Sequence, residues 1–297
     1  YARLANKTLS DLEAGASGRV EGEGQLKEHP FDFALWKAAK PGEVSWESPW
    51  GAGRPGWHIE CSVMATEILG DTIDIHGGGA DLEFPHHTNE IAQSECKTGQ
   101  TFANYWMHNA MLNINDEKMS KSLGNFLTAH EMMKQVDGQV LRFFLATQHY
   151  RRPLNYTEKA IHDAETNLKY LKNTYTQPFT DQVEEGKWQQ LVADFVQAMD
   201  DDFNTANGIT VVFDMAKWIN SGNYDADIKA DFAQILAVFG IVFQEEVLDI
   251  EIEDLIAERQ QARANRDFVT ADRIRDELAA QGIKLLDTKD GVRWTRD

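Results

Sequence analysis

Apolar residues recur at helical spacing through the middle of the chain, and this pattern limits the fold more than any other feature. The first stripe, in residues 158–175, contains Ala160, Ile161, Ala164, Leu168 and Leu171. Similar stripes occupy residues 188–199, 205–219 and 228–243. Because residues three or four positions apart share one face of a helix, each stripe predicts an amphipathic helix. We therefore expect residues 151–247 to form an α-helical bundle domain.

The segments on both sides of the bundle predict mixed α/β structure. Residues 73–75 are typical of a short strand ending in a glycine turn at residues 77–79, and Pro85 stands where a helix would begin. This order predicts an α/β domain in residues 1–150. After the bundle, a helical stripe ends at Gly282, and two apolar runs around residues 289–291 predict a hairpin. Residues 248–297 should form a small mixed α/β domain.

Composition narrows the class of protein. The chain has 297 residues, of which 42% are hydrophobic, and these values are ordinary for a globular protein. It has no run of about 18 apolar residues and no basic segment followed by an apolar one at its start, which argues against a membrane span or a secretion signal. We expect a cytoplasmic protein with no membrane partner, whose two cysteines stay reduced.

The net charge of −19 disfavours a general role in binding phosphate backbones. Residues 251–297 are nearly balanced, however, with 9 Lys and Arg against 11 Asp and Glu. Most of the acidic excess therefore lies elsewhere, and the C-terminal part can still present a local basic surface. Asp200, Asp201 and Asp202 precede Asn204 and Thr205, which are suitable helix N-caps. This acidic run either supports the helix start or contacts a partner.

Three side chains suggest a metal site. His86 and Glu90 are four residues apart and share a helix face, and the fold can bring Cys61 to them. A thiolate, an imidazole and a carboxylate together suit zinc. The alternative is an ordinary surface pair of His86 and Glu90. His87 should point away from this face, and Cys96 should be a buried structural thiol.

A second signature lies at residues 118–122, which read KMSKS. Lys118 and Lys121 can neutralise charge as a triphosphate breaks, although a pair of solvated lysines is the simpler alternative. We expect these residues in a short polar loop. The triple glycine at residues 77–79 permits close approach of a nucleotide, but it also suits a plain tight turn.

Together these segments resemble class I aminoacyl-tRNA synthetases, and within them the cysteinyl-tRNA synthetase family. The similar motifs are GAGRPGWHIECS at residues 51–62, HGGG at 76–79, FPHH at 84–87, NEIAQS at 89–94 and KMSKS at 118–122. The resemblance covers essentially the whole chain. It implies a Rossmann-like catalytic domain, present in part, then a helical bundle, then a C-terminal domain that recognises the tRNA anticodon.

The resemblance also implies roles for the zinc and amino-acid site. Cys61, His86 and Glu90 would be ligands of one Zn²⁺ per chain, which would bind the thiolate of substrate L-cysteine. Serine has no soft sulfur ligand, so binding alone would reject it. Trp57 would line the amino-acid pocket.

The resemblance also implies which residues bind ATP and the tRNA. Gly77, Gly78, Gly79 and Asp81 would face ATP, and Lys121 with Lys118 would hold its phosphates, with Mg²⁺, while a cysteinyl-adenylate forms. The cysteine would then pass to tRNA(Cys). Candidate tRNA contacts are Arg293, Trp294 and Arg296, for which a solvated terminus is an equal alternative.

The chain also departs from the family. The family's N-terminal half carries a His-Ile-Gly-His-type motif and another zinc-binding cysteine, and neither is found here; the chain starts at Tyr1. We expect a fragment whose partner is the missing N-terminal half of the same enzyme and which is inactive or nearly so alone. One alternative is the related ligase that joins cysteine to an amino sugar in mycothiol synthesis. Another is a non-catalytic tRNA-binding protein.

Overall fold

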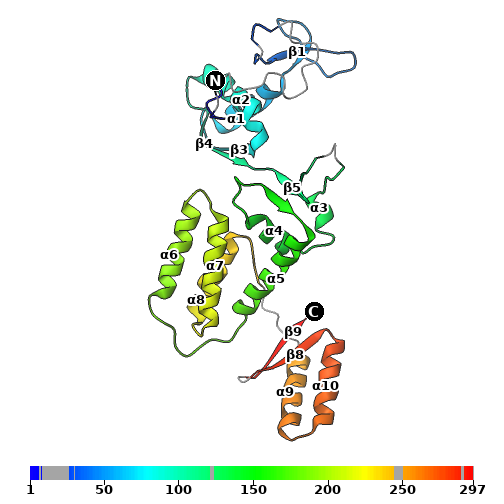
Figure 1. The fold of residues 1–297 in the computed structure, drawn as a ribbon. Coiled ribbons are helices and arrows are strands. Elements are labelled where there is room, and N and C mark those ends of the chain that lie inside the picture. Colours follow the sequence, from blue (N-terminus) through cyan, green and yellow to red (C-terminus); the bar gives the residue numbers. More distant parts are fainter. Residues whose placement is uncertain are drawn as a thin grey trace. The chain divides into compact units, whose positions relative to one another are not determined.

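The computed structural model describes residues 1–6, 8, 27–29, 31–120, 124–243, 250–288 and 291–296. The chain forms two compact units, Tyr1–Val242 and Phe243–Asp297. Figure 1 shows the elements of each unit in sequence colours. None of the described helices is long and apolar enough to cross a membrane.

The first unit contains a strand–helix–strand crossover. The parallel strands are β3 (Ile73–Gly79) and β4 (Ala103–Asn109), paired from Ile73↔Ala103 to Gly79↔Asn109. Between them come short helical turns at Ala80–Leu82 and Glu83–His87 and helix α2 (Thr88–Thr98), and α1 (Trp57–Leu69) precedes β3. Ile73, Phe102 and Ala103 form a core on which Ala65 of α1 and Ile91 of α2 pack. The helices are thereby held against the strands.

The predicted glycine turn at residues 77–79 is wrong. Strand β3 continues through all three glycines as far as Gly79. The strand can continue because β4 provides a backbone partner for each of them, including Gly77↔Met107 and Gly78↔His108.

Short strands complete the α/β part of the first unit. β1 (Trp36–Ala38) and β2 (Gly53–Pro55) form an antiparallel ribbon that leads into α1. In a second sheet β5 (Leu112–Ile114) lies between β6 (Glu117–Lys118), antiparallel to it, and β7 (Leu154–Tyr156), parallel to it. Helices α3 (Ala129–Met132) and α4 (Gly138–Ala146) connect β6 to β7 along the chain. Parallel strands and helices therefore occur together, as expected of an α/β region.

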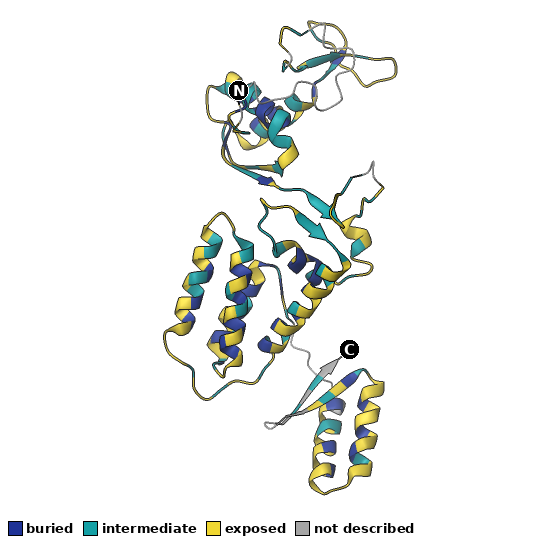
Figure 2. Cartoon of the chain, in the orientation of Figure 1, coloured by how far each residue is buried: buried dark blue, intermediate teal, exposed yellow. Residues whose placement is uncertain are grey.

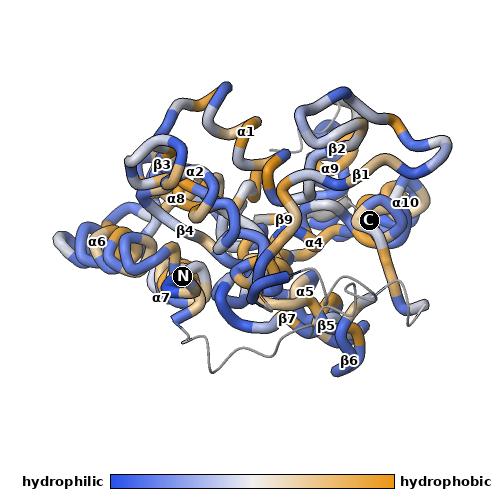
Figure 3. The backbone as a smooth tube through the Cα atoms, turned by 90° about the horizontal axis from the view of Figure 1, so that it is seen from above, coloured by the Kyte–Doolittle hydropathy of each residue, from blue (hydrophilic) through white to orange (hydrophobic). Residues whose placement is uncertain are grey.

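The predicted helices of the bundle are present. They are α5 (Glu158–Tyr175), α6 (Lys187–Asp200), α7 (Thr205–Asn220) and α8 (Ala226–Val238). Leu171, Met215 and Phe232 are completely buried, and Figure 2 shows buried positions interspersed with exposed ones along these helices. Figure 3 shows the matching mixture of apolar and polar residues. Helix α8 ends five residues before the predicted end at 243, because Gly240 adopts a left-handed φ of +69° that a helix cannot continue through.

The acidic run before α7 has a role that the sequence left open. Asn204 caps α7, its side chain accepting a hydrogen bond from Asn207 N at 3.1 Å. Asp202 instead accepts hydrogen bonds from Tyr150 Oη at 2.6 Å and Arg151 Nε at 2.5 Å. The loop before α7 is thereby tied to the segment that precedes β7.

The second unit is a helical hairpin followed by a strand hairpin. Its elements are α9 (Ile250–Ala264), α10 (Phe268–Ala280), β8 (Ile283–Thr288) and the antiparallel β9 (Gly291–Arg296). The predicted hairpin is confirmed, while Lys289 and Asp290 of its turn lie outside the described residues. A core of Ile252, Ile274, Leu278 and Ile283 packs against Trp294. The side chains of Arg293 and Arg296 are outside the described part.

Candidate functional site

Cys61, His86 and Glu90 come together in the first unit. Each offers one ligand atom, and the three atoms lie within 4.8 Å of one another. Cys61 is on α1, His86 is in the helical turn before α2, and Glu90 is in the first turn of α2. The expected shared face is present, with His86 Nε2 2.7 Å from Glu90 Oε1. The packing of Ala65 and Ile91 into one core holds α1 beside α2 and so supplies the third group.

Glu90 also belongs to a second group. His76, His87 and Glu90 offer ligand atoms within 4.8 Å of one another. His76 Nε2 lies 2.6 Å from Glu90 Oε2, so each carboxylate oxygen faces a different imidazole. His87 is absent from the group of Cys61 and His86, as predicted, but it is buried, 2% exposed, and meets Glu90 in this second group, which was not predicted. Residues Glu83–His87 form a kinked turn in which the backbone of Phe84 is extended, with φ −138° and ψ 131°, and both neighbouring histidines are buried.

The donor set and its burial fit a metal ion. Glu90 is 1% exposed, and its Oε1 accepts no hydrogen bond although His86 Nε2 is near it. A buried carboxylate oxygen without a hydrogen bond is costly unless a cation satisfies it. Sulfur, nitrogen and oxygen donors at such separations are those that zinc accepts.

A second layer of rings surrounds these groups. His58 Nδ1 lies 2.7 Å from His86 Nδ1, and His87 Nδ1 lies 2.8 Å from His108 Nε2. Trp57 stacks on His86 with ring centroids 4.3 Å apart. Trp57 is 49% exposed, so it covers the His86 ring from the solvent side. The predicted pocket residue therefore lies directly against a predicted ligand.

Sequence reasoning did not assign His58, His76 or His108 to this cluster. His58 and Cys61 are three residues apart on α1, and this spacing was a signal that could have included His58. His76 and His108 lie on β3 and β4, and only the parallel register brings their strands together beside α2. No local pattern reports that arrangement.

Burial lowers the pKa of four of the imidazoles and so keeps them neutral. It lowers the pKa of His58 and of His87 to about 4, with neighbouring histidines adding to the effect. It also lowers the pKa of His86 and of His108. The charge of Lys37 contributes further to the lowered pKa of His58. Since neutral imidazole is the form that binds a metal, the cluster is ready to coordinate one near neutral pH.

Cys61 behaves in the opposite way. Burial, followed by the negative charges of Glu90 and Glu60, raises the pKa of the Cys61 thiol. A thiol in such surroundings stays protonated unless a cation offsets the nearby carboxylates. A positive charge bound beside Cys61, His86 and Glu90 would therefore favour formation of the Cys61 thiolate.

The glycines of β3 are explained first by packing. A Cβ on Gly78 would lie 2.7 Å from Cε1 of His87, and a Cβ on Gly79 would lie 2.5 Å from Oδ1 of Asp81. A Cβ on Gly77 would make only an ordinary contact, 3.5 Å from the Met107 carbonyl oxygen. Asp81 is exposed. Contact of these residues with a nucleotide stays a prediction.

The KMSKS segment is only partly described. Lys118 lies in strand β6 and not in a loop, because its residue pairs with Asn113 of β5. Its side chain is exposed, and Asn125 supports the segment by accepting from Ser120 N at 2.9 Å and donating to Lys118 O at 3.2 Å. Lys121 and Ser122 lie outside the described residues.

Cys96 is exposed, so the prediction of a buried structural thiol is wrong. It follows Ser94, which is buried, by two residues, and therefore faces a different side of α2. The rotation about the helix axis that separates Cys96 from the face of His86 also points its thiol to solvent.

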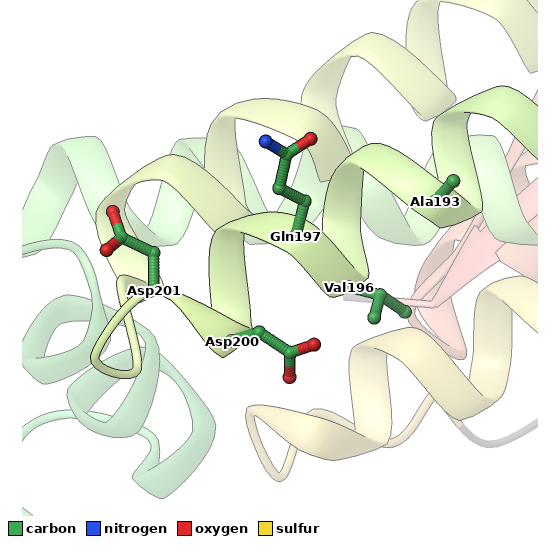
Figure 4. A pocket seen from close by; sticks show the side chains of 5 residues that line it. All are labelled: Ala193, Val196, Gln197, Asp200 and Asp201. Atoms are coloured by element: carbon green, nitrogen blue, oxygen red, sulfur yellow. The ribbon is translucent and has the colours of Figure 1, made fainter.

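A shallow depression on α6 has no comparable chemistry. Figure 4 shows its lining residues, Ala193, Val196, Gln197, Asp200 and Asp201. All of these are exposed. The depression contains no cluster of histidine or cysteine, so the groups around Glu90 remain the candidate site.

Comparisons with known proteins cover the whole chain. The family model described as tRNA synthetases class I (C) catalytic domain matches residues 1–166. A DALR domain model matches residues 194–244, and a cysteinyl-tRNA ligase anticodon binding domain model matches residues 246–294.

Individual relatives agree with these matches. Proteins named cysteine–tRNA ligase from Streptococcus agalactiae serotype V, Streptococcus thermophilus CNRZ 1066 and Streptococcus pyogenes serotype M18 are each 76% identical over all 297 residues. The chain spans 66% of the length of each relative. A solved LeuRS–tRNA–LeuAMS ternary complex from Agrobacterium radiobacter K84 is far more distant, with 12% identity and a TM-score of 0.47 over 66% of this chain and 34% of that one.

Proposed function

The chain belongs to the cysteinyl-tRNA synthetase family of class I synthetases, and we propose that it contributes to ATP-dependent ligation of L-cysteine to tRNA(Cys) through a cysteinyl-adenylate. The observation that carries this proposal is the group of Cys61, His86 and Glu90, whose ligand atoms lie within 4.8 Å of one another. A soft-metal site of this kind would let a ligase distinguish cysteine from serine, because a thiolate is a soft ligand and a hydroxyl group is not.

Cys61, His86 and Glu90 would hold one zinc ion. Bound there, zinc would supply a Lewis acid that prefers a thiolate to a hydroxyl group. The chain's own residues support that role: His58 and His76 flank His86 and Glu90 at hydrogen-bond distance and so orient them. Trp57 covers His86 and would shield the amino acid from water.

The nucleotide would be held by residues on two segments. We assign Gly77, Gly78, Gly79 and Asp81 to the ATP side, and Lys118 and Lys121 to the phosphates, with Mg²⁺. Support for Lys118 comes from its exposed position at the end of a short strand, where its ammonium can reach a ligand. The lysines would stabilise the negative charge that develops as the cysteine carboxylate attacks the α-phosphate and pyrophosphate leaves.

The domain arrangement proposed is a partial Rossmann-like catalytic domain in residues 1–150, a helical bundle in 151–247 and an anticodon-recognition domain in 248–297. The parallel crossover of β3 and β4 supports the first part. The anticodon-binding family match supports the last and favours the tRNA enzyme over the cysteine–amino-sugar ligase. Arg293 and Arg296 are proposed tRNA contacts, and Trp294 would position them through its packing on the core.

Cysteine-dependent exchange of pyrophosphate into ATP tests this proposal. It is measured with the chain alone and with the chain joined to the part of a Streptococcus agalactiae relative that it does not span. In the joined protein, Cys61→Ser should abolish most exchange, whereas Cys96→Ser is the matched control because its thiol is exposed. Full exchange by the Cys61→Ser protein would contradict the assignment.

A further inference from the structure

A second group of ligand atoms shares Glu90 with the candidate zinc site, and the proposed function does not use it to hold an ion. We call His76, His87 and Glu90 the His76 group; each offers one atom, and these atoms lie within 4.8 Å of one another. His76 lies on β3, whereas His87 ends the turn before α2 and Glu90 lies in the first turn of that helix. His87 and Glu90 are both buried. Polar side chains buried to this degree need partners of their own.

The carboxylate of Glu90 has a separate oxygen for each group. Its Oε1 lies 2.7 Å from Nε2 of His86, on the side of the candidate zinc site. Its Oε2 lies 2.6 Å from Nε2 of His76. Because each carboxylate oxygen has lone pairs of its own, Glu90 can serve two cations at once.

Hydrogen bonding determines which nitrogen His87 presents to a ligand. Nδ1 of His108 lies 3.5 Å from Oε1 of Glu83, which favours a proton on that nitrogen and leaves Nε2 of His108 as an acceptor. This Nε2 lies 2.8 Å from Nδ1 of His87, which therefore donates to it. In the neutral ring, Nε2 of His87 then carries a lone pair and no proton. Histidine and carboxylate partners behind a metal-binding imidazole orient it and raise its basicity.

Gly78 leaves room beside that lone pair. A Cβ at this position would lie 3.1 Å from Nε2 of His87 and 2.7 Å from its Cε1. A larger residue would therefore crowd the Nε2 edge of the ring, where a cation would bind. Glycine in β3 keeps this edge accessible.

The donor set and the nearby charges indicate which ion would bind and how tightly. Two imidazole nitrogens and one carboxylate oxygen suit a divalent transition metal such as Zn²⁺, whereas Mg²⁺ prefers oxygen ligands. Glu90 would supply one negative charge to two ions. Burial and, to a smaller degree, the charge of Arg151 lower the pKa of His108, so Arg151 is close enough to oppose a further cation. The second ion should therefore bind more weakly than the first.

We propose that His76, His87 and Glu90 bind a second divalent transition-metal ion, with the Glu90 carboxylate joining it to the ion held by Cys61 and His86. In the metal-free chain, Nε2 of His76 donates a hydrogen bond to Oε2 of Glu90, and the ion takes the place of that proton. This inference goes beyond the proposed function and needs only the geometry of these residues.

Titration of the metal-free full chain with Co²⁺ alone, followed by absorption, tests the proposal. An ion bound to Cys61 gives a sulfur-to-cobalt charge-transfer band, whereas an ion at the His76 group adds ligand-field absorption without that band. We expect both signals, with the second saturating at a Co²⁺ concentration about tenfold or more above the first. Calorimetric titration with Zn²⁺ should give the same two steps, and excess Mg²⁺ should abolish neither.

Point variants assign the two steps. His76→Gln should remove the second step and retain the first, because the glutamine amide can still donate to Glu90 but is a poor ligand for these metals. His87→Gln should act in the same way. Cys61→Ser should remove the sulfur band and retain the second step. His162→Ala is the matched control, since His162 is an exposed histidine on α5 and its loss should leave both steps unchanged.

A single binding step in the unsubstituted chain would overturn the proposal. So would a second step that both His76→Gln and His87→Gln leave unchanged, or one that His162→Ala removes. A sulfur band that survives Cys61→Ser would instead refute the zinc site of the proposed function, and the ligand-field signal of the His76 group would still be tested by its own variants.

Discussion

Replacing Gly78 by alanine should destabilise the first unit through one contact. The added Cβ would lie 2.7 Å from Cε1 of His87, 3.1 Å from its Nε2 and 3.2 Å from Cδ1 of Leu82. His87 is 2% exposed and its Nδ1 lies 2.8 Å from His108 Nε2, so its ring has little room to move. Overpacking of this kind costs about 1–3 kcal/mol. We expect a loss of that size in the free energy of unfolding, measured by urea denaturation.

Two further variants isolate the cause. Gly77→Ala adds the same methyl group at 3.5 Å from the nearest atom, so it should change stability by less than about 1 kcal/mol in either direction. His87→Ala removes the ring that the new Cβ would strike. In the double variant the cost of Gly78→Ala should largely disappear, giving a coupling energy of about 1 kcal/mol or more.

Additivity of the two substitutions would refute this reasoning. It would mean that His87 does not pack against Gly78. A neutral Gly78→Ala with impaired ATP binding would indicate that the glycine serves only the nucleotide.

Other predictions concern the bundle, the loop before α7 and the histidine cluster. Leu171→Ala should lower the free energy of unfolding by about 2–5 kcal/mol in urea, because Leu171 is fully buried; a smaller loss would contradict its place in the core. Asp202→Asn should cost at most about 1 kcal/mol, since the ion pair with Arg151 is half exposed; a larger loss would show a deeper coupling. His58 and His87 have pKa values of about 4, below the ordinary 6.5, so the unfolded state takes up protons first and the stability of the metal-free chain should fall as pH drops from 6.5 to 4. His87→Gln should flatten that fall, and an unchanged profile would contradict it.

The bundle was predictable because its signal is local. A helix that buries one face repeats that face every three or four residues, so α5 was predicted at its observed bounds of Glu158–Tyr175. The end of α8 was missed because apolar residues continue beyond Gly240, and periodicity does not report the left-handed φ that stops the helix. Lys118 was assigned to a loop because a two-residue strand such as β6 has no pattern of its own.

The candidate site was predictable only where its residues share a helix. His86 and Glu90 were paired from their spacing, and the structure brings them within 2.7 Å of each other. The place of His87 beside Glu90 was missed because the kinked turn before α2, with its extended Phe84, departs from regular helical geometry. His76 reaches Glu90 from a strand through tertiary packing, which spacing along the sequence does not encode.

X-ray absorption at the zinc edge tests the central claim most directly. The zinc-loaded chain should show a sulfur at about 2.3 Å that Cys61→Ser removes and Cys96→Ser retains. Addition of L-cysteine should add one sulfur to this shell, and L-serine should add none. A sulfur shell that ignores Cys61→Ser, or that L-cysteine leaves unchanged, would contradict a zinc site built on Cys61, His86 and Glu90 to select the substrate thiolate.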